Sequence, residues 1–403
     1  MAIPQEGLTY EALHLQGVEA QLQGEFATAE ACYLQALAIE PGYAFSQLAL
    51  AQLHMMNTRF HAGRDVYEAR FAAVTEGSGP DWRGLPFARW RGESLAGKKL
   101  YLWAEQGLGD IMMFAGFLSA LLAQKPARIA LGMFPKLIPV FARSFAGIDV
   151  EPVDDAANHA LMPTMLASFP QIEQFAELSA VPFSLAPLRA SYEYANRHGL
   201  FDYAAPMGDV LVHCLPSYIP AEHQASVITP QPQRVDEAKG RLVKLGEGRR
   251  IGIAWHTDNK REPQRNVPLQ EWVEVLRAPG CRFVSLQHRV SATETDAFCS
   301  AQGCSIYTDP QIDPVQDAEG LIALVAAMDE VITIDNSVAH IAGVLGVKTT
   351  LLLPRGHNFR WPVLEGGGTL WYKHMRVLRQ ENAADWREVM EKVKNDLFSG
   401  LPS

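Results

Sequence analysis

Two glycines and an aspartate close the segment WAEQGLGD, which spans residues 103–110. Gly107 and Gly109 permit a tight turn and let a ligand come close to the backbone. The carboxylate of Asp110 could take up a proton from a hydroxyl group, as a general base does. Asp110 could also be the N-cap of the helix that it begins, and the two roles are compatible.

A second segment, WHTDNKREPQRN (255–266), concentrates Lys260, Arg261 and Arg265 in a chain with 45 acidic and 35 basic residues. Arginine forks suit phosphate oxygens, and a local positive field attracts an anionic ligand. The same residues could instead form a solvated charged loop. We predict that Lys260 and Arg265 bind an anionic ligand.

A third segment, VITIDNSVAHIAG (331–343), contains Asp335, Asn336, Ser337 and His340 at the point where an apolar strand passes into a helix. The free amides at such a helix start make a ready diphosphate site. His340 lies in the first turn of the helix, where it could donate to a phosphate or simply fill the interior. The later segment PRGHNFRW (354–361) adds Arg360 and aromatic side chains, which could hold a base or sugar or only cover the edge of a sheet.

Other ligand classes have weaker support in these loops. The third glycine of a dinucleotide fingerprint would fall at Met112, and no acidic residue ends the following strand, which disfavours a nicotinamide enzyme. No Asp-x-Asp pair follows an apolar strand, and no His/Cys cluster has ligand spacing. We therefore expect neither an obligatory metal nor a bound cofactor.

The elements that position these loops alternate between strand and helix, which predicts an α/β fold with parallel sheets covered on both faces. Strands are expected at 98–104, 127–134, 149–153 and 210–215, and again at 250–255, 282–287, 305–308, 331–335, 349–353 and 375–378. Helices are expected at 110–124, 135–144, 171–180 and 384–397. Two such lobes would form a cleft, and parallel sheets bind ligands at the carboxyl ends of their strands.

The first 80 or so residues are expected to be helical and to repeat every 34 residues. Phe26 recurs as Phe60, and Tyr33 recurs as Tyr67. This spacing is typical of tetratricopeptide repeats, which are pairs of antiparallel helices. A helical hairpin that resembles a repeat by chance is the alternative, which two copies in register make less favoured.

The composition is that of a soluble globular protein, with 48% apolar and 20% charged residues among 403. A net charge of −10 disfavours a nucleic-acid binder. The longest apolar stretch, 112–123, is too short to span a membrane. The five cysteines form no CxxC pair and no signal peptide is visible, which favours a cytoplasmic protein.

The segments WAEQGLGDIMMF, GIAWHTDNKREPQRNVPL and IDNSVAHIAGVLGVKTTLLLP, the last followed by FRW, resemble the bacterial tetratricopeptide-repeat glycosyltransferases related to the heptosyltransferase (family nine) group. The resemblance covers most of the chain and is weakest over 154–208. It implies a GT-B fold, in which two Rossmann-like lobes bind the acceptor and the nucleotide-sugar donor. The implied domains are repeats at 1–76, a linker at 77–97, an acceptor lobe at 98–245, a donor lobe at 246–383 and a closing helix at 384–403.

The resemblance also assigns roles to residues. Asp110 matches the family's proposed general base, and Asp335, Ser337 and His340 match its donor-binding motif. Asn336 stands where the family usually has Ser or Thr, and His256 stands where it usually has Ala. The implied function is an inverting, metal-independent transfer of a sugar from a nucleotide-sugar to a protein or envelope-precursor acceptor, which the repeats would position.

Two other functions are compatible with the same sequence. The chain could be a non-catalytic scaffold, in which the repeats recruit a partner and the GT-B body is degenerate. It could also be a nucleotide-sugar epimerase, which needs no separate acceptor. Fold alone does not choose among these functions.

Overall fold

The computed structural model describes residues 8–67, 69, 87–152, 199–215, 217–223, 225–258, 262–362, 364 and 366–399. The predicted helix at 171–180, together with Lys260 and Arg261, lies outside the described residues. The chain divides into two compact units. The first comprises Met1–Val18, Ala27–Gln106 and Phe114–Tyr218, and the second comprises Glu19–Phe26, Gly107–Met113 and Ile219–Ser403.

Four helices begin the described chain, as the sequence predicts. They are α1 (Tyr10–Leu22), α2 (Phe26–Ile39), α3 (Ala44–Met56) and α4 (Phe60–Tyr67). Phe26 and Phe60, one repeat length apart, begin α2 and α4, and both Tyr33 and Tyr67 are buried. A Cβ atom on Gly17 would lie 2.5 Å from the Tyr33 ring, so only glycine lets α1 and α2 approach this closely. That these helices form a tetratricopeptide module stays a prediction.

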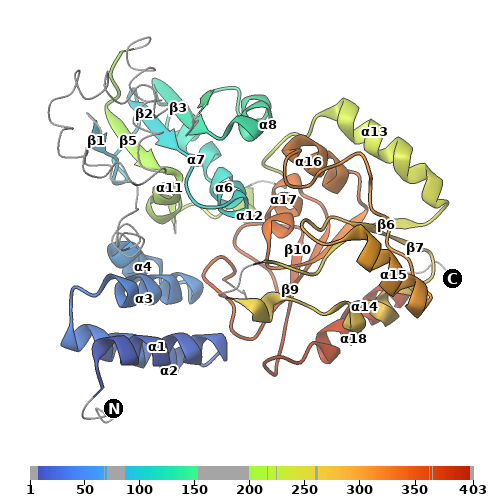
Figure 1. Cartoon of the computed structure of the whole chain (residues 1–403). Coiled ribbons are helices and arrows are strands. Elements are labelled where there is room, and N and C mark those ends of the chain that lie inside the picture. Colours follow the sequence, from blue (N-terminus) through green and yellow to red (C-terminus); the bar gives the residue numbers. More distant parts are fainter. Residues whose placement is uncertain are drawn as a thin grey trace, which may run out of the picture. The chain divides into compact units, whose positions relative to one another are not determined.

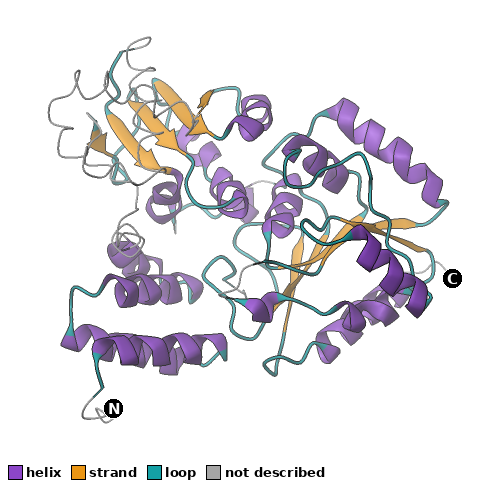
Figure 2. Cartoon of the chain, viewed as in Figure 1, coloured by secondary structure: helices purple, strands orange, loops and turns teal. Residues whose placement is uncertain are grey.

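The first unit contains a sheet of five parallel strands in the order β1-β5-β2-β3-β4 (Figure 1). The strands are β1 (Ala88–Arg89), β2 (Lys99–Trp103), β3 (Arg128–Met133), β4 (Asp149–Pro152) and β5 (Tyr203–Pro206). The helices between them are α6 (Leu108–Ala115), α7 (Leu118–Ala123), the 3-10 turn η2 (Pro135–Leu137), α8 (Ile138–Ser144) and α11 (Met207–Cys214). Figure 2 shows the strands of this sheet side by side.

Three expectations for the strands and helices around this sheet are wrong. The helix expected at 110–124 is divided into α6 and α7, and α6 begins at Leu108, so Asp110 lies inside its first turn and is not its N-cap. The strand expected at 210–215 is part of helix α11, because short apolar runs are ambiguous and this one is buried on nearly every side. Within the expected linker at 77–97, Ala88 and Arg89 form edge strand β1, which pairs with β5. Arg89 donates to Asp209 on α11 at 2.8 Å, and both side chains are buried, so this part of the chain is tied to the sheet.

The second unit contains another five-stranded parallel sheet, in the order β10-β9-β8-β6-β7 (Figure 1). Its strands are β6 (Arg249–Ala254), β7 (Cys281–Ser285), β8 (Glu330–Ile334), β9 (Thr349–Leu353) and β10 (Met375–Arg379). The order in which strands are added to the sheet reverses between β6 and β8, and open parallel sheets bind ligands beyond the carboxyl ends of the strands at such a point. The loops after these two strands are the second and third segments singled out in the sequence.

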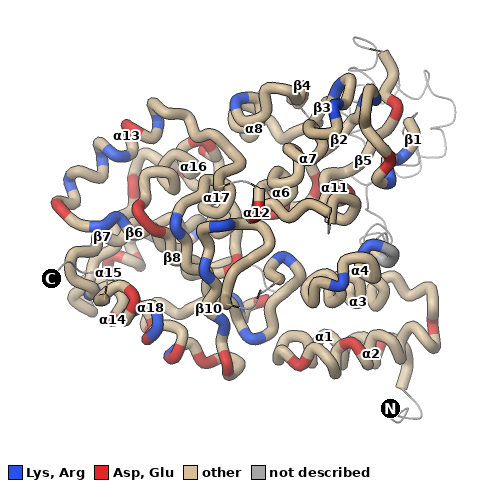
Figure 3. The backbone as a smooth tube through the Cα atoms, turned by 180° about the vertical axis from the view of Figure 1, so that it is seen from behind, with Lys and Arg blue, Asp and Glu red and all other residues tan. Residues whose placement is uncertain are grey.

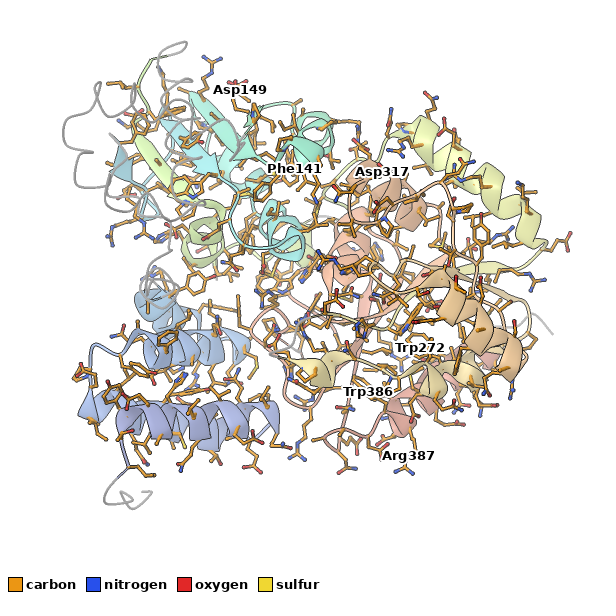
Figure 4. All side chains as sticks on the ribbon, viewed as in Figure 1. Phe141, Asp149, Trp272, Asp317, Trp386 and Arg387 are labelled. Carbon is orange, nitrogen blue, oxygen red and sulfur yellow. The ribbon has the colours of Figure 1, made fainter. Side chains whose placement is uncertain are left out.

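Helices cover both faces of the second sheet, with α14, α15 and α18 on one face and α13, α16 and α17 on the other (Figure 1). They are α13 (Pro232–Leu242), α14 (Leu269–Leu276), α15 (Ala292–Gln302), α16 (Ala318–Ala326), α17 (Ser337–Leu345) and α18 (Arg387–Ser399), with shorter turns α12 (Pro220–His223), η4 (Val243–Leu245) and η5 (Pro263–Arg265). Trp272 of α14 and Trp386, just before α18, belong to one buried cluster with the sheet (Figure 4). Because the sheet is packed against helices in this way, it is a rigid support for the loops that follow its strands.

Two elements of the second unit differ from expectation. The strand expected at 305–308 is reduced to a single bridge between Val284 and Tyr307. The closing helix begins at Arg387, three residues later than Ala384, because Ala384 has a φ of 62°, which a right-handed helix does not allow.

Charged residues of both signs occur along the outer helices, as along α13 and α18 (Figure 3). Among the helices in the described ranges, none is long and apolar enough to cross a membrane.

Candidate functional site

Asp335 lies at the carboxyl end of β8 and is 1% exposed. Its carboxylate accepts hydrogen bonds from Trp361 Nε1 at 2.6 Å and Asn358 Nδ2 at 3.0 Å, and forms an ion pair with Arg265 Nη1 at 3.2 Å. Burial raises the pKa of this carboxyl, but the Arg265 guanidinium and the Trp361 N–H outweigh burial and hold that pKa below its usual value. Asp335 is therefore a fixed, buried carboxylate that organises its neighbours.

Arg265 contacts both that carboxylate and the backbone of Asp335. Its Nη1 also donates to the Asp335 carbonyl oxygen at 3.0 Å, and its Nη2 lies 2.9 Å from a Glu262 carboxylate oxygen. Its Nε is buried and has no hydrogen-bond partner in the described part of the chain. The sequence predicted that Arg265 binds a phosphate; in the structure Nε is the nitrogen left for a ligand.

Helix α17 starts directly after Asp335. The Asn336 side chain is its N-cap and accepts from the amides of Val338 at 2.9 Å and Ala339 at 3.4 Å. The amides that the sequence expected to be free are thus partly satisfied by the chain's own cap, and a diphosphate would compete with that side chain. Asn336 Nδ2 is buried and has no partner among the described residues.

His340, one turn into α17, is 2% exposed. Its Nδ1 lies 2.8 Å from the Tyr372 hydroxyl oxygen, and its ring stacks on Trp361 with centroids 4.3 Å apart. Its Nε2 has no partner in the described ranges. Burial lowers the pKa of His340 to about 4, against the opposing pull of Asp335, so the ring is neutral at pH 7.

The low pKa of His340 makes stability depend on pH. Between about pH 6.5 and pH 4, the unfolded chain binds a proton that the folded ring does not, so the free energy of unfolding falls as the pH is lowered through this window. This one histidine changes the free energy of unfolding by roughly 3 kcal/mol across that pH range. We expect His340→Gln to flatten the pH dependence measured by urea unfolding. The exposed His61, changed to Gln, is the control, and equal slopes in the two variants would contradict a buried neutral His340.

Asp110 lies in the same unit as these residues. Its carboxylate accepts from Arg360 Nε at 2.5 Å and from the Gly107 amide at 3.1 Å. Burial lowers the pKa of Arg360, but the Asp110 charge outweighs burial and keeps that pKa above its usual value. A Cβ atom on Gly109 would lie 2.9 Å from His340 Cδ2, so glycine is needed for the turn to meet α17. The structure therefore brings the glycine turn and the α17 start together.

Three buried nitrogen atoms without partners in the described chain mark the carboxyl ends of β6 and β8. They are Arg265 Nε, Asn336 Nδ2 and His340 Nε2. Buried polar groups are nearly always hydrogen-bonded in folded proteins, so several such atoms at the carboxyl ends of two adjacent parallel strands make this edge of the sheet a candidate site for a ligand that supplies oxygen acceptors. The arginine and amide nitrogens are donors in any state; the histidine nitrogen is a donor when the Tyr372 hydroxyl donates to Nδ1.

Of the residues expected to bind a donor, the structure groups Arg265, Asp335, Asn336, Ser337, His340 and Arg360, while Lys260 lies outside the described residues. The sequence missed Tyr372 and Glu262, which contact His340 and Arg265 and which nothing in their spacing marks. In the described ranges, no group of three His, Cys, Asp or Glu side chains is placed to hold a metal ion. Metal independence stays a prediction.

Comparison with known proteins agrees with this architecture. No protein-family model matches the sequence. Protein FlbA of Caulobacter vibrioides is 29% identical over 359 residues, which are 88% of this chain and 55% of FlbA, so the chain spans about half the length of that curated relative.

Solved glycosyltransferase structures also resemble the chain. A glycosyl transferase family 9 protein from Veillonella parvula covers 77% of this chain and is itself covered completely, with a TM-score of 0.52 and 15% identity. The ADP-heptose lipopolysaccharide heptosyltransferase II of E. coli covers 75% with a TM-score of 0.46 and 13% identity. The first of these likenesses shows that the two-sheet α/β body has the fold of a family 9 glycosyltransferase, the GT-B-like fold that the sequence predicts.

Proposed function

We propose that this protein transfers a sugar from a nucleotide-sugar donor to an acceptor hydroxyl. The observation that carries the proposal is the set of three unpartnered buried nitrogens at the start of α17 and in the loop after β6. A diphosphate supplies the acceptors that Arg265 Nε and Asn336 Nδ2 lack, and a helix start favours its negative charge. The shared fold with a family 9 glycosyltransferase supports the same conclusion by analogy.

The ion pair between Asp110 and Arg360 suggests how donor binding prepares the reaction. In the structure Arg360 occupies both carboxylate oxygens of Asp110, at 2.5 and 3.3 Å. A diphosphate bound at the start of α17 attracts the same guanidinium. When Arg360 is shared with that diphosphate, one carboxylate oxygen of Asp110 is available to take up a proton. Donor binding and exposure of the base are thereby linked through one arginine.

In the proposed step, Asp110 takes the proton of the acceptor hydroxyl as its oxygen forms a bond to the anomeric carbon. The bond from that carbon to the diphosphate breaks, and its electron pair leaves with the diphosphate. Attack opposite the leaving group inverts the anomeric configuration. Arg265, Lys260 and the α17 start stabilise the departing charge in place of a metal. The acceptor is a protein or envelope precursor that the N-terminal helices position.

A nucleoside diphosphate is expected to bind at the α17 start, and Asn336→Asp is the sharpest variant to test this. The aspartate keeps the oxygen that caps α17 but replaces the unpartnered Nδ2 donor by a negative oxygen. We expect affinity to fall by about tenfold or more, the range for losing one hydrogen bond to a charged group. Calorimetry with ADP, GDP, UDP and CDP measures it.

The control is Asn382→Asp, which adds the same charge at an exposed position outside the site. If both variants bind a nucleoside diphosphate with equal affinity, Asn336 is not part of the binding site. Failure of all four nucleotides to bind wild-type protein would overturn the proposal and favour the non-catalytic scaffold. Release of an altered nucleotide-sugar without any acceptor would favour the epimerase.

A further inference from the structure

The second unit contains a pocket of about 520 Å³ at the carboxyl ends of β9 and β10. Its lining residues are Gly24, Phe26, Arg355, Arg379, Gln380 and Glu381. The proposed nucleotide site lies at the ends of β6 and β8, on other strands of the same sheet. The volume is within the usual range for sites that hold small molecules.

The turn between α1 and α2 contributes Gly24 and Phe26 to the lining of the pocket. Gly24 has a φ of 75°, and a Cβ atom there would lie 2.5 Å from Arg355 Cγ. A Cβ atom on Gly356 would lie 2.1 Å from the Leu22 carbonyl oxygen. Phe26 packs edge-to-face on His357, with ring centroids 5.4 Å apart. Two glycines and an aromatic pair thus hold this turn against the loop after β9.

Gln380, which follows β10, presents a polar atom that nothing in the described chain satisfies. The residue is 2% exposed, and its own amide donates to the Leu353 carbonyl oxygen at 3.0 Å. Its Oε1 accepts from the Arg355 amide at 3.3 Å, which fixes which end of the side chain is the donor. The remaining Nε2 is buried and has no partner among the described residues. A ligand that offers an oxygen would satisfy it.

The charges at the pocket favour an anion. Arg355 Nη1 donates to the Glu381 carbonyl oxygen at 3.2 Å, and no carboxylate of the described residues forms an ion pair with Arg355 or Arg379. The Glu381 carboxylate lies 3.8 Å from Lys392 Nζ on α18. His357 adds no charge at neutral pH, because burial first and then the nearby Arg379 lower its pKa to about 4. Two guanidinium groups that form no ion pair in the described chain therefore face one lining carboxylate, that of Glu381, and the pocket carries a net positive charge.

We propose that this pocket binds an anionic monosaccharide, either a sugar phosphate or a sugar acid, separately from the nucleotide site. Arg355 and Arg379 hold its anionic oxygens, and Gln380 donates to one of them. Phe26 supplies an apolar wall for the carbon face of the sugar. The inference does not require the proposed transferase activity, because it rests on residues of another part of the sheet.

Calorimetry with glucose 6-phosphate and with glucuronate, each compared with neutral glucose, tests the proposal on the full-length chain. We expect at least one anion to bind and glucose not to bind, and the anion that binds identifies phosphate or carboxylate as the preferred group. Arg379→Gln should weaken binding by about tenfold or more. Gln380→Glu keeps the oxygen that accepts from Arg355 and replaces the unpartnered donor, so it should abolish binding without loss of folding.

Two controls separate this pocket from the nucleotide site. Arg376→Gln removes an exposed arginine of the same strand, which pairs with Asp396 on α18, and should leave binding unchanged. Asn336→Asp should also leave it unchanged, although it weakens nucleoside diphosphate binding. The proposal is overturned if neither anion binds more tightly than glucose. It is also overturned if Arg379→Gln and Arg376→Gln have the same affinity, or if Asn336→Asp abolishes anion binding.

Discussion

Replacing Asp110 by Asn is expected to lower turnover about 10²–10⁴-fold, the usual contribution of a general base. The amide has nearly the same size and still accepts from the Gly107 amide, which donates to Asp110 at 3.1 Å. It takes up no proton at neutral pH, however, so it cannot serve as the base. Turnover of a nucleotide-sugar with a suitable acceptor, measured beside the melting temperature, separates loss of chemistry from loss of fold.

Arg360→Gln is the matched variant for this experiment, because Asp110→Asn also removes the ion pair with Arg360. Arg360→Gln removes the same pair, which joins Nε and Oδ1 at 2.5 Å, but leaves the carboxylate in place. If Asp110 is the base, Asp110→Asn should lose much more turnover than Arg360→Gln at saturating donor. Equal losses would assign the effect to the ion pair, and near-normal turnover in Asp110→Asn would remove it as the base.

Replacing Asp335 by Ala is expected to lower the free energy of unfolding by about 3–5 kcal/mol, the cost of breaking a buried ion pair from one side. The variant leaves the Arg265 guanidinium, whose side chain is 10% exposed, with Glu262 as its one ion-pair partner in the described chain, and it removes the acceptor of the Trp361 indole N–H. Arg265→Ala should be similarly costly, because it leaves the carboxylate buried and unpaired. A weakened nucleotide affinity in Arg265→Ala therefore needs a stability measurement beside it.

Urea unfolding at pH 7 measures this loss, with Glu274→Gln as the control. Glu274 forms an exposed ion pair with Arg277 at 2.8 Å, and such pairs contribute no more than about 1 kcal/mol. Because the folded pKa of Asp335 is depressed, its contribution is complete above the unfolded pKa and is lost as the pH falls through the folded pKa. A loss near that of Glu274→Gln would show that Asp335 does not organise the site.

Much of the fold follows from local patterns in the sequence. The strands of the second sheet are short apolar runs such as Val331–Ile334 and 349–353, because both faces of a parallel sheet are covered by helices. Small and polar residues after those runs mark helix starts, as Asn336 does for α17. Helices α1 to α4 were expected from aromatic residues that recur 34 positions apart, as Phe26 and Phe60 do. The strands and the helix starts depend on neighbours a few residues apart, which a sequence displays directly.

The local sequence pattern predicted the wrong secondary structure where burial and packing determine which element forms. Residues 207–214 contain an apolar run that suits a strand, yet they form helix α11, because burial on nearly every side removes the contrast between a period of 2 and one of 3.6. The strand expected at 305–308 is a single bridge to Val284, since sheet pairing depends on what lies beside a segment.

The candidate site, like the fold, could be predicted from the sequence only in part. The sequence selected Asp110, Asp335, His340 and Arg360 from residue type and from their places after strands. Only the folded chain joins Asp110 to Arg360, 250 positions later, and Arg265 to Asp335, 70 positions later. Arg265 meets Asp335 because the parallel strands β6 and β8 bring their carboxyl ends to one edge of a sheet whatever the chain length between them. Asp110 follows β2 of the other sheet, so its contact with Arg360 has no such origin and depends on tertiary packing alone. The chemical type of each site residue is therefore read directly from the sequence, whereas its partners, its burial and its pKa are set by contacts between distant segments.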